Sequence, residues 1–317
     1  MNKKLILDLD TGIDDALALA YVLASPEVEL IGVATSYGNV LLQQGIENTL
    51  AFLDMLGHPE IPVYAGLPHP QTAHSYEVSQ VVQEIHGENG CANLEIPRSK
   101  RQVEKQSAVD FIIEAARQYG SNLLYVPTGP LTNLSAALKK DYEAIASIGG
   151  IYDMGGALAC EGNERPWAEA NIFKDPEAAR DCFESGLDIV MVGLDVTHQT
   201  LLTLEDTKKW RALNTQAAKV YADMCDFYIK AEMKLAGLEG CGLHDPLTAA
   251  VAIDPSLVRC FNTNLTVDVL EPTRGRTIGA NNKLTQHPKT CHVALEVETK
   301  RFMEEFMNRM MHILAVQ

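Results

Sequence analysis

The first 23 residues combine a strand, a tight turn and a helix with a run of acidic side chains, and this segment constrains the fold more than any other. Residues 5–9 are apolar apart from one aspartate, and residues 16–23 carry the apolar periodicity of a helix. Gly12 permits a sharp turn between them. The segment therefore predicts the strand–turn–helix unit of an α/β fold, and it contains four carboxylates: Asp8, Asp10, Asp14 and Asp15.

These carboxylates have two interpretations. Asp14 or Asp15 caps the helix, because a carboxylate satisfies unpaired N–H groups at a helix N-terminus, but capping explains at most two of the four. Alternatively, Asp10 and Asp15 face each other at the carboxyl end of the strand, where open α/β sheets bind ligands. Carboxylates this close repel each other unless a cation or a proton lies between them, and a purely oxygen ligand set suits Ca²⁺ or Mg²⁺. We favour the metal site.

Predicted strands alternate with predicted helices through the first two thirds of the chain. The strands after the first are expected over residues 28–35, 61–64, 122–127, 147–152 and 187–194. This alternation indicates an open, mostly parallel central sheet with helices on both faces. The last third is mostly helical, with a small strand pair expected within residues 257–297 and a closing amphipathic helix over residues 299–315. No repeat or linker interrupts the pattern, so we expect a single domain over residues 1–317.

Charge and cysteine usage exclude several classes of partner. The formal net charge of −16 argues against a nucleic-acid polymer, because binding phosphates requires a basic surface. The seven cysteines are scattered and contain no C-x-x-C pair, which is typical of reduced thiols in a cytosol. No apolar stretch has the length of a signal peptide or approaches the ~18 residues of a membrane span. We expect a cytoplasmic protein that binds neither nucleic acid nor membrane.

Polar residues follow the carboxyl ends of several predicted strands. Asn39 follows the second strand, and Thr128 follows a middle one. A later loop adds Asn163, Glu169 and Asn171. Each residue alone is explained as a turn or cap residue. Because parallel strands bring such loops to one edge of a sheet, we expect them to form a polar rim around the acidic residues.

A further acidic residue lies at the start of a late predicted helix. Asp245 followed by Pro246 is typical of an N-cap and a first helical position, and a capping carboxylate can still offer its other oxygen to a cation. His244 beside it is either a loop histidine or a proton donor near neutral pH. We include both His244 and Asp245 in the candidate site as a hypothesis.

Short motifs occur in a fixed order along the chain: DLDTGIDDA at residues 8–16, GN at 38–39, HGE at 86–88, VPTGPLTN at 126–133, MGG at 154–156, EGN at 161–163, AEAN at 168–171, DPEAA at 175–179, VGLDVTH at 192–198 and HDP at 244–246. In this order they resemble the inosine–uridine preferring nucleoside hydrolase family over nearly the whole chain. The resemblance implies a Rossmann-like nucleoside hydrolase fold and hydrolysis of the N-glycosidic bond of ribonucleosides, giving ribose and a free purine or pyrimidine base. It also implies a tightly held Ca²⁺ and a homodimer or homotetramer.

The resemblance implies a role for each site residue. Ca²⁺ would be held by three carboxylates and one backbone carbonyl, those of Asp10, Asp15, Asp245 and Thr128. Asp10 would take a proton from a metal-bound water, the nucleophile in an oxocarbenium-like transition state, and His244 would assist the leaving base. The residues implied in binding the ribonucleoside are Asp14, Asn39, Asn163, Glu169 and Asn171 at the ribose and His86 at the base.

Two departures from the family pattern concern substrate recognition. Ala170 replaces the aromatic residue of a Glu-Phe-Asn triplet, and we hypothesise that Trp167 partly refills that space near the 5′ side of ribose. Glu232 and Gly237 stand where some relatives carry aromatic residues that contact the base. The sequence therefore leaves the preference for purine or pyrimidine bases open.

Other functions compete with this one. A phosphohydrolase of the haloacid-dehalogenase type also begins with two aspartates separated by one residue, but the chain lacks the later Gly-Asp-x-x-x-Asp element that holds Mg²⁺. A catalytically inactive nucleoside- or Ca²⁺-binding protein is expected to lose Asp10 or His244, and both are present. An EF-hand is excluded because Ile13 and Leu19 occupy its glycine and glutamate positions. The sequence favours the hydrolase.

Overall fold

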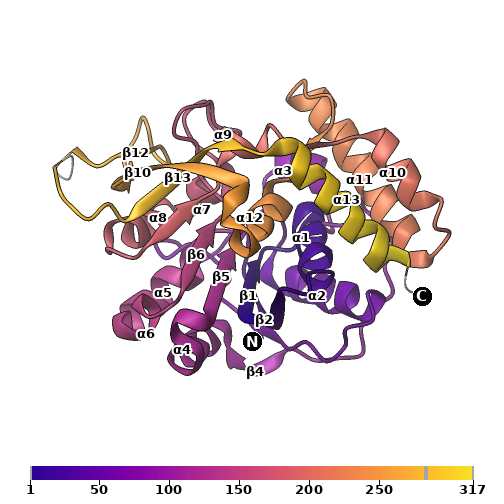
Figure 1. The fold of residues 1–317 in the computed structure, drawn as a ribbon, viewed down its shortest axis with the longest axis horizontal. Coiled ribbons are helices and arrows are strands. Elements are labelled where there is room, and N and C mark those ends of the chain that lie inside the picture. Colours follow the sequence, from indigo (N-terminus) through magenta and orange to yellow (C-terminus); the bar gives the residue numbers. More distant parts are fainter. Residues whose placement is uncertain (1, 282–284, 316–317) are drawn as a thin grey trace.

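The computed structural model describes residues 2–281 and 285–315, and within them nine strands form one sheet (Figure 1). In sheet order the strands are β10 (Val258–Thr263), β13 (Cys291–Val297), β7 (Ile189–Met191), β6 (Gly150–Asp153), β5 (Leu123–Pro127), β1 (Lys3–Leu9), β2 (Val28–Thr35), β3 (Val63–Ala65) and β4 (Glu104–Ser107). Every neighbouring pair is parallel except β10 and β13. The predicted open, mostly parallel sheet is confirmed.

Helices cover both faces of this sheet. One hydrophobic cluster joins the sheet to α1 (Ile13–Leu23), α2 (Leu42–Met55), α11 (Gln216–Leu235), α12 (His244–Ile253) and α13 (Thr299–Ala315). A second cluster joins the other face to α4 (Ala108–Tyr119), α5 (Thr132–Lys140), α6 (Tyr142–Ala146) and α8 (Pro176–Glu184). In Figure 1, α13 lies along α1, and α11 lies beside α10 (Leu204–Arg211) at the end of the molecule away from β10.

Side-chain alternation along β1 separates its residues between the two faces. Leu7 belongs to the first cluster and Ile6 to the second, because successive side chains of a strand point to opposite faces. Asp8 lies on the same face as Ile6, where its carboxylate accepts hydrogen bonds from the Tyr125 hydroxyl and from Asn133 Nδ2. Asp8 is therefore fully partnered within the fold.

The chain reverses its direction across the sheet at β1. From β1 it proceeds outward through β2, β3 and β4, and it then returns to β5 on the other side of β1. The loops after β1 and β5 therefore lead away in opposite directions, and open α/β sheets bind ligands at such a point. The backbone N–H of Thr128 donates to the carbonyl of Asp8 at 2.9 Å, which holds the two loops side by side.

Long periodic elements are confirmed within a few residues, whereas short ones depart from the sequence prediction. Periodicity does not predict β4, α3 (Gln80–His86) or α7 (Ala170–Lys174), because a four-residue strand and helices of one or two turns offer too few repeats. The N-cap of α12 is Leu243, two residues before the predicted Asp245, and the helix begins at His244. The expected strand pair is confirmed as antiparallel β11 (Leu265–Val267) and β12 (Thr277–Gly279); residues 282–284 of that stretch lie outside the described residues.

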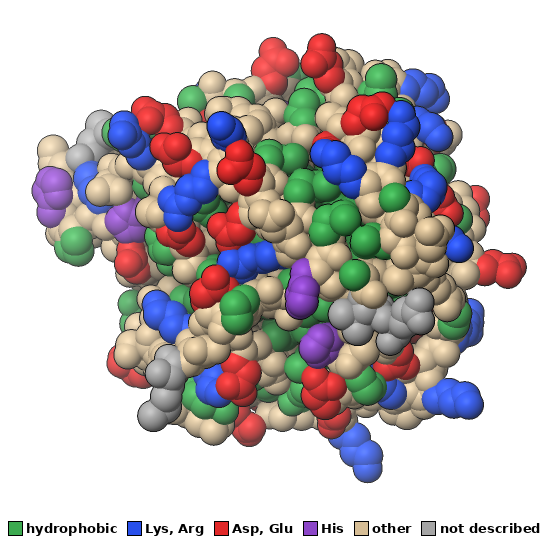
Figure 2. Space-filling model, turned by 45° about the vertical axis from the view of Figure 1, so that its right-hand side comes forward, with side chains coloured by type: hydrophobic (Ala, Val, Ile, Leu, Met, Phe, Trp, Pro, Cys, Tyr) green, Lys and Arg blue, Asp and Glu red, His purple; other side chains and the backbone are tan. Residues whose placement is uncertain are grey.

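The surface in Figure 2 mixes acidic and basic side chains across the face that is drawn. None of the described helices is long and apolar enough to span a membrane. The remaining short elements are α9 (Leu194–Thr197) and the antiparallel pair β8 (Leu201–Leu202) and β9 (Cys241–Gly242).

Candidate active site

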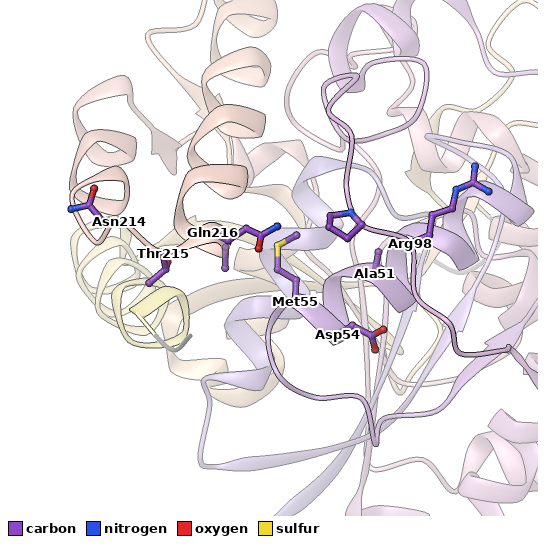
Figure 3. Close-up of a pocket in the computed structure, with 9 residues that line it drawn as sticks. Ala51, Asp54, Met55, Arg98, Asn214, Thr215 and Gln216 are labelled. Carbon is purple, nitrogen blue, oxygen red and sulfur yellow. The ribbon is translucent and has the colours of Figure 1, made fainter.

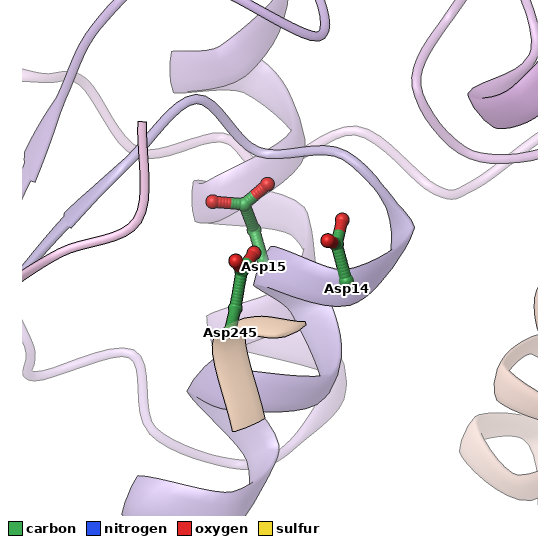
Figure 4. Close-up of side chains that lie close together, drawn as sticks. All are labelled: Asp14, Asp15 and Asp245. Carbon is green, nitrogen blue, oxygen red and sulfur yellow. The ribbon is translucent and has the colours of Figure 1, made fainter. Parts of the chain in front are cut away.

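Three buried carboxylates from two helices meet beyond the carboxyl end of β1. Asp14 and Asp15 lie in the first turn of α1 and Asp245 lies in the first turn of α12 (Figure 4). One oxygen of each lies within 4.8 Å of the others, and we name these residues the carboxylate cluster. Among the described residues, Asp14 Oδ1 and Asp245 Oδ2 have no hydrogen-bond partner. Because buried polar atoms are nearly always partnered, two such oxygens in one cluster indicate a missing cation or proton.

The electrostatics of the carboxylate cluster also favour a bound cation or proton. Burial raises the pKa of Asp14 to about 7, and the neighbouring charge of Asp10 adds to the effect. Burial also raises the pKa values of Asp15 and Asp245 well above the ordinary range, and the surrounding carboxylates contribute in the same direction. A hard divalent cation relieves this repulsion and displaces the protons. The donor set, which contains only oxygen, fits Ca²⁺ or Mg²⁺.

Asp15 combines a capping role with a place in the cluster. Its Oδ2 accepts a hydrogen bond from the backbone N–H of Gly12 at 2.8 Å, which caps α1, and another from Asn39 Nδ2 at 3.2 Å. Its Oδ1 accepts from the Thr128 hydroxyl at 2.8 Å and from the backbone N–H of Asp10 at 3.2 Å. A Cβ on Gly12 would lie 2.9 Å from Asn39 Nδ2, so this close approach requires glycine. The loops after β1, β2 and β5 are thereby fixed around one carboxylate.

Asp10 lies beside the carboxylate cluster, and its carboxylate accepts hydrogen bonds from Asn39 and Lys174. Its Oδ2 accepts from the backbone N–H of Asn39 at 2.7 Å and from Lys174 Nζ at 3.2 Å, and its Oδ1 accepts from Asn39 Nδ2 at 3.2 Å. The sequence interpretation does not include Lys174 among the site residues. In the sequence, Lys174 is marked only by its place directly before Asp175-Pro176, the N-cap and first residue of α8. An exposed lysine fits that place equally well, so the sequence does not indicate a buried one.

The predicted polar rim surrounds these carboxylates. Asn171 Nδ2 donates to the carbonyl of Thr128 at 2.7 Å and to that of Met154 at 3.1 Å. Glu169 is buried, caps α7 and accepts from Asn171 N at 2.8 Å, and burial raises the pKa of its carboxyl. Asn163 is exposed, and its Oδ1 accepts a hydrogen bond from the backbone N–H of Ala170, the first residue of α7, at 2.9 Å. Asn171 and Glu169 therefore lie at the site, and Asn163 lies at its outer edge.

His86, the last residue of α3, lies beside Asp14 of the carboxylate cluster. Its Nδ1 accepts a hydrogen bond from the backbone N–H of Ile13 at 3.2 Å, so the ring proton lies on Nε2. Burial lowers the pKa of His86 to about 3, and Lys174 contributes in the same direction. The ring is therefore neutral, and its 3.9 Å approach to Asp14 is no ion pair. Tyr228 of α11 packs against the ring with centroids 5.3 Å apart.

His244 is held by a residue that sequence reasoning did not single out. Its Nδ1 lies 2.7 Å from the hydroxyl of Thr197, and the ring of His198 lies edge-on at 5.6 Å between centroids. Burial lowers the pKa of His244 to about 3, and His198 and His86 contribute in the same direction. Thr197 and His198 belong to the VTH segment of the sequence motif at residues 192–198. That motif is the signal that could have identified them.

Trp167 contacts the β11–β12 region. Its Nε1 donates to the carbonyl of Arg274 at 3.2 Å, and the side chain is half-buried. The guanidinium of Arg274 forms a two-point ion pair with Glu177 of α8, at 2.6 and 2.7 Å. These contacts fasten the β11–β12 segment to the loop that precedes α7. The role of Trp167 at the ribose stays a hypothesis.

A separate cavity of about 520 Å³ lies between α2 and the start of α11 (Figure 3). It contains none of the predicted site residues. Its lining residues are Ala51, Asp54, Met55, Pro97, Arg98, Asn214, Thr215, Gln216 and Ala217.

The chain is similar to nucleoside hydrolases in sequence and in structure. The family model of the inosine-uridine preferring nucleoside hydrolases matches residues 5–304. A probable uridine nucleosidase 2 from Arabidopsis thaliana is 35% identical over 98% of both chains, and a pyrimidine-specific ribonucleoside hydrolase RihA from Shewanella sp. (strain MR-7) is 37% identical over 96% of this chain and 95% of that protein. Among solved structures, a purine-preferring ribonucleoside hydrolase from Gardnerella vaginalis has a TM-score of 0.97 and 55% identity, covering 99% of this chain and 100% of the other.

Proposed function

The chain belongs to the inosine-uridine preferring nucleoside hydrolase family, and from this premise we propose that it hydrolyses the N-glycosidic bond of ribonucleosides to ribose and a free base in a Ca²⁺-dependent reaction. One observation carries the proposal: three buried carboxylates lie together, and two of their oxygens lack a partner among the described residues. Such a cluster suits a hard cation. It also suits the positive charge that develops on ribose as the bond breaks.

We assign the metal to the carboxylates of Asp10, Asp15 and Asp245 and to the backbone carbonyl of Thr128. Asp15 and Asp245 already lie together in the cluster, and Thr128 is hydrogen-bonded to Asp15. When bound, Ca²⁺ would acidify the attacking water and align the ribose diol. Asp14 is left to bind a ribose hydroxyl, and its unpartnered Oδ1 supports this assignment.

Asp10 is the proposed base. It would accept a proton from the water that attacks the anomeric carbon, and Asn39 fixes its carboxylate through two hydrogen bonds. A carboxylate held in one orientation favours a productive alignment of water and ribose. The proposed ribose contacts are Asp14, Asn39, Asn163, Glu169 and Asn171.

His244 is the proposed partner of the leaving base. Its low pKa makes it neutral at neutral pH. When the Thr197 hydroxyl donates to Nδ1, the ring proton lies on Nε2, which can then donate to the base as negative charge develops there. His86 also carries its proton on Nε2, and we propose it as a second contact on the base side.

We propose purine ribonucleosides as the preferred substrates. The Gardnerella enzyme is titled purine-preferring and is 55% identical, whereas the relatives named for uridine or pyrimidine substrates are 35–37% identical. Glu232 on α11 stands four residues from Tyr228, which packs on His86, and burial raises the pKa of its carboxyl. A carboxyl group on this side of the site offers hydrogen-bonding oxygens that suit the ring nitrogens of a purine.

Release of ribose tests the function directly. Protein treated with a chelator and desalted is incubated with inosine, adenosine, uridine or cytidine, with and without added Ca²⁺. We expect ribose to be released faster from inosine and adenosine, and only after Ca²⁺ is added. Absence of ribose from all four nucleosides would contradict the hydrolase proposal, and undiminished activity without Ca²⁺ would contradict the metal assignment.

We also propose a domain organisation, an oligomeric state and a location for the protein. A sheet built from strands of both ends of the chain supports one domain over residues 1–317. A homodimer or homotetramer and a cytoplasmic location stay predictions from the sequence.

A further inference from the structure

A buried lysine reaches into the candidate active site. Lys174 is the last residue of α7, and only 7% of its side chain is exposed. Its Nζ donates to Asn171 Oδ1 at 3.1 Å, to Asp10 Oδ2 at 3.2 Å and to Asn39 Oδ1 at 3.4 Å. An ammonium has three donors, and each has an acceptor here. A lysine usually keeps its charged end in water, so this nearly complete burial indicates a specific role.

The ammonium remains charged in this environment. Lysine is ordinarily charged at neutral pH, and the Asp10 carboxylate, which accepts one of its three hydrogen bonds, favours the charged form. A positive charge therefore lies beside the carboxylate that is also a proposed metal ligand. Two cations that share one carboxylate repel each other, and the effect is strong at short range in a buried site.

Lys174 also fixes the orientation of the side-chain amides of Asn39 and Asn171. Asn39 Nδ2 donates to Asp10 and Asp15, and Asn171 Nδ2 donates to the Thr128 carbonyl. In both residues the opposite amide atom, Oδ1, accepts from the ammonium. Without this donor, either amide could rotate and exchange its donor and acceptor ends.

We propose that Lys174 is a built-in cation of the site, which positions Asp10, Asn39 and Asn171 for the ribose and weakens the binding of the divalent ion. This inference rests on the proposed function, because it assumes that the same residues bind ribose and Ca²⁺. Lys174 acts through these neighbours and is therefore a positioning residue.

The experiment compares charge-free and charge-retaining variants of Lys174 in the full chain. Lys174→Met removes the charge at nearly constant length, Lys174→Arg keeps the charge, and Lys140→Met removes an exposed lysine that pairs with Asp110 on the surface. Ca²⁺ affinity is measured by calorimetric titration of chelator-treated protein, without substrate. KM and kcat are measured separately with the best nucleoside at saturating Ca²⁺.

For Lys174→Met we expect Ca²⁺ to bind at least about tenfold more tightly, because a repelling charge is gone, and KM to rise at least about tenfold. Lys174→Arg should keep the weaker Ca²⁺ binding, and Lys140→Met should match the wild type in both measurements. Unchanged or weaker Ca²⁺ binding by Lys174→Met, or an unchanged KM, would overturn the inference. If Lys174→Met does not fold, Lys174→Gln provides the same test.

The two levels of the proposal can fail separately. A wild-type protein that neither binds Ca²⁺ nor releases ribose would contradict the proposed function. A wild-type protein that does both, with a Lys174→Met variant that matches it, would contradict only the role of Lys174.

Discussion

Two kinds of buried carboxylate occur within eight residues of the same segment. Asp8 is buried and fully partnered, since Tyr125 and Asn133 both donate hydrogen bonds to it. Asp14 is also buried, but its Oδ1 has no partner among the described residues, and its neighbours are also carboxylates. Burial alone therefore does not mark a ligand. The combination of burial, an unpartnered oxygen and like charges nearby distinguishes an aspartate of the candidate active site from a structural one.

The largest effect is expected from removing a charge in the carboxylate cluster. Asp245→Asn should lower kcat/KM by at least about a thousandfold, because Asp245 is a proposed ligand of the cation that activates water. Steady-state ribose release at saturating Ca²⁺ measures this. A loss of less than tenfold, with a normal thermal unfolding midpoint, would show that an unpartnered oxygen is a poor guide to a ligand.

The partnered aspartate should behave in the opposite way. Asp8→Ala should reduce the free energy of unfolding by about 2 kcal/mol, because it removes the acceptor of the buried Tyr125 hydroxyl and leaves Asn133 Nδ2 with only the Thr35 carbonyl. Denaturant unfolding measures the loss, and calorimetric titration should show Ca²⁺ affinity unchanged. If Ca²⁺ affinity fell together with stability, Asp8 and the cluster would not be the separate classes that their contacts indicate.

The pH dependence of stability should separate Asp14 from an ordinary carboxylate. Its pKa rises from 3.8 to about 7 in the folded protein, so the folded state binds this proton more tightly than the unfolded state does. Its contribution to stability is therefore greatest below about pH 4 and is lost as the pH rises from 4 to 7. Asp14→Asn cannot undergo this loss.

Thermal unfolding of metal-free protein tests whether Asp14 destabilises the fold as the pH rises. The midpoint of Asp14→Asn should exceed that of the wild type by several degrees at pH 7 and by much less at pH 4. Saturating Ca²⁺ should reduce the advantage of the variant, because the cation stabilises the ionised cluster of the wild type. An advantage of equal size at both pH values would mean that Asp14 is not protonated in the metal-free protein.

The smallest effect is expected at the partnered His244. Thr197→Val removes the hydroxyl beside Nδ1, so the ring loses its fixed tautomer, and kcat should fall by about tenfold. Thr197→Ser should restore most of the activity. We expect the loss to be larger for nucleosides with poor leaving bases, and equal losses for every base would argue against a role for His244 at the leaving group.

Much of the site could be predicted because parallel strands determine where their loops meet. Asp15, Asn39 and Thr128 follow three different strands, and hydrogen bonds join them as the sheet order requires. The sequence does not separate Asp8 from Asp10 by face, because the strand ends at Leu9 and alternation does not extend beyond it.

Other parts depend on contacts that no local pattern encodes. Lys174 is placed by the five-residue helix α7, which is too short to show periodicity and is capped by Glu169. The predicted N-cap role of Asp245 is wrong, because the N-cap of α12 is Leu243, two residues earlier, and Asp245 lies within the first turn. The Asp245 carboxylate therefore does not cap the helix and instead lies in the carboxylate cluster. Shifts of one or two residues at a helix end determine which side chains converge, and only the packed structure fixes them.

A Ca²⁺ titration of activity tests the central claim most directly. Chelator-treated protein at a concentration well above its Ca²⁺ dissociation constant receives increasing amounts of Ca²⁺, and the rate of ribose release from inosine is measured after each addition. The carboxylate cluster predicts no release at the start and a linear rise that reaches a plateau at one Ca²⁺ per chain. A rate that is already maximal before any Ca²⁺ is added would contradict the claim that this cluster holds the catalytic cation.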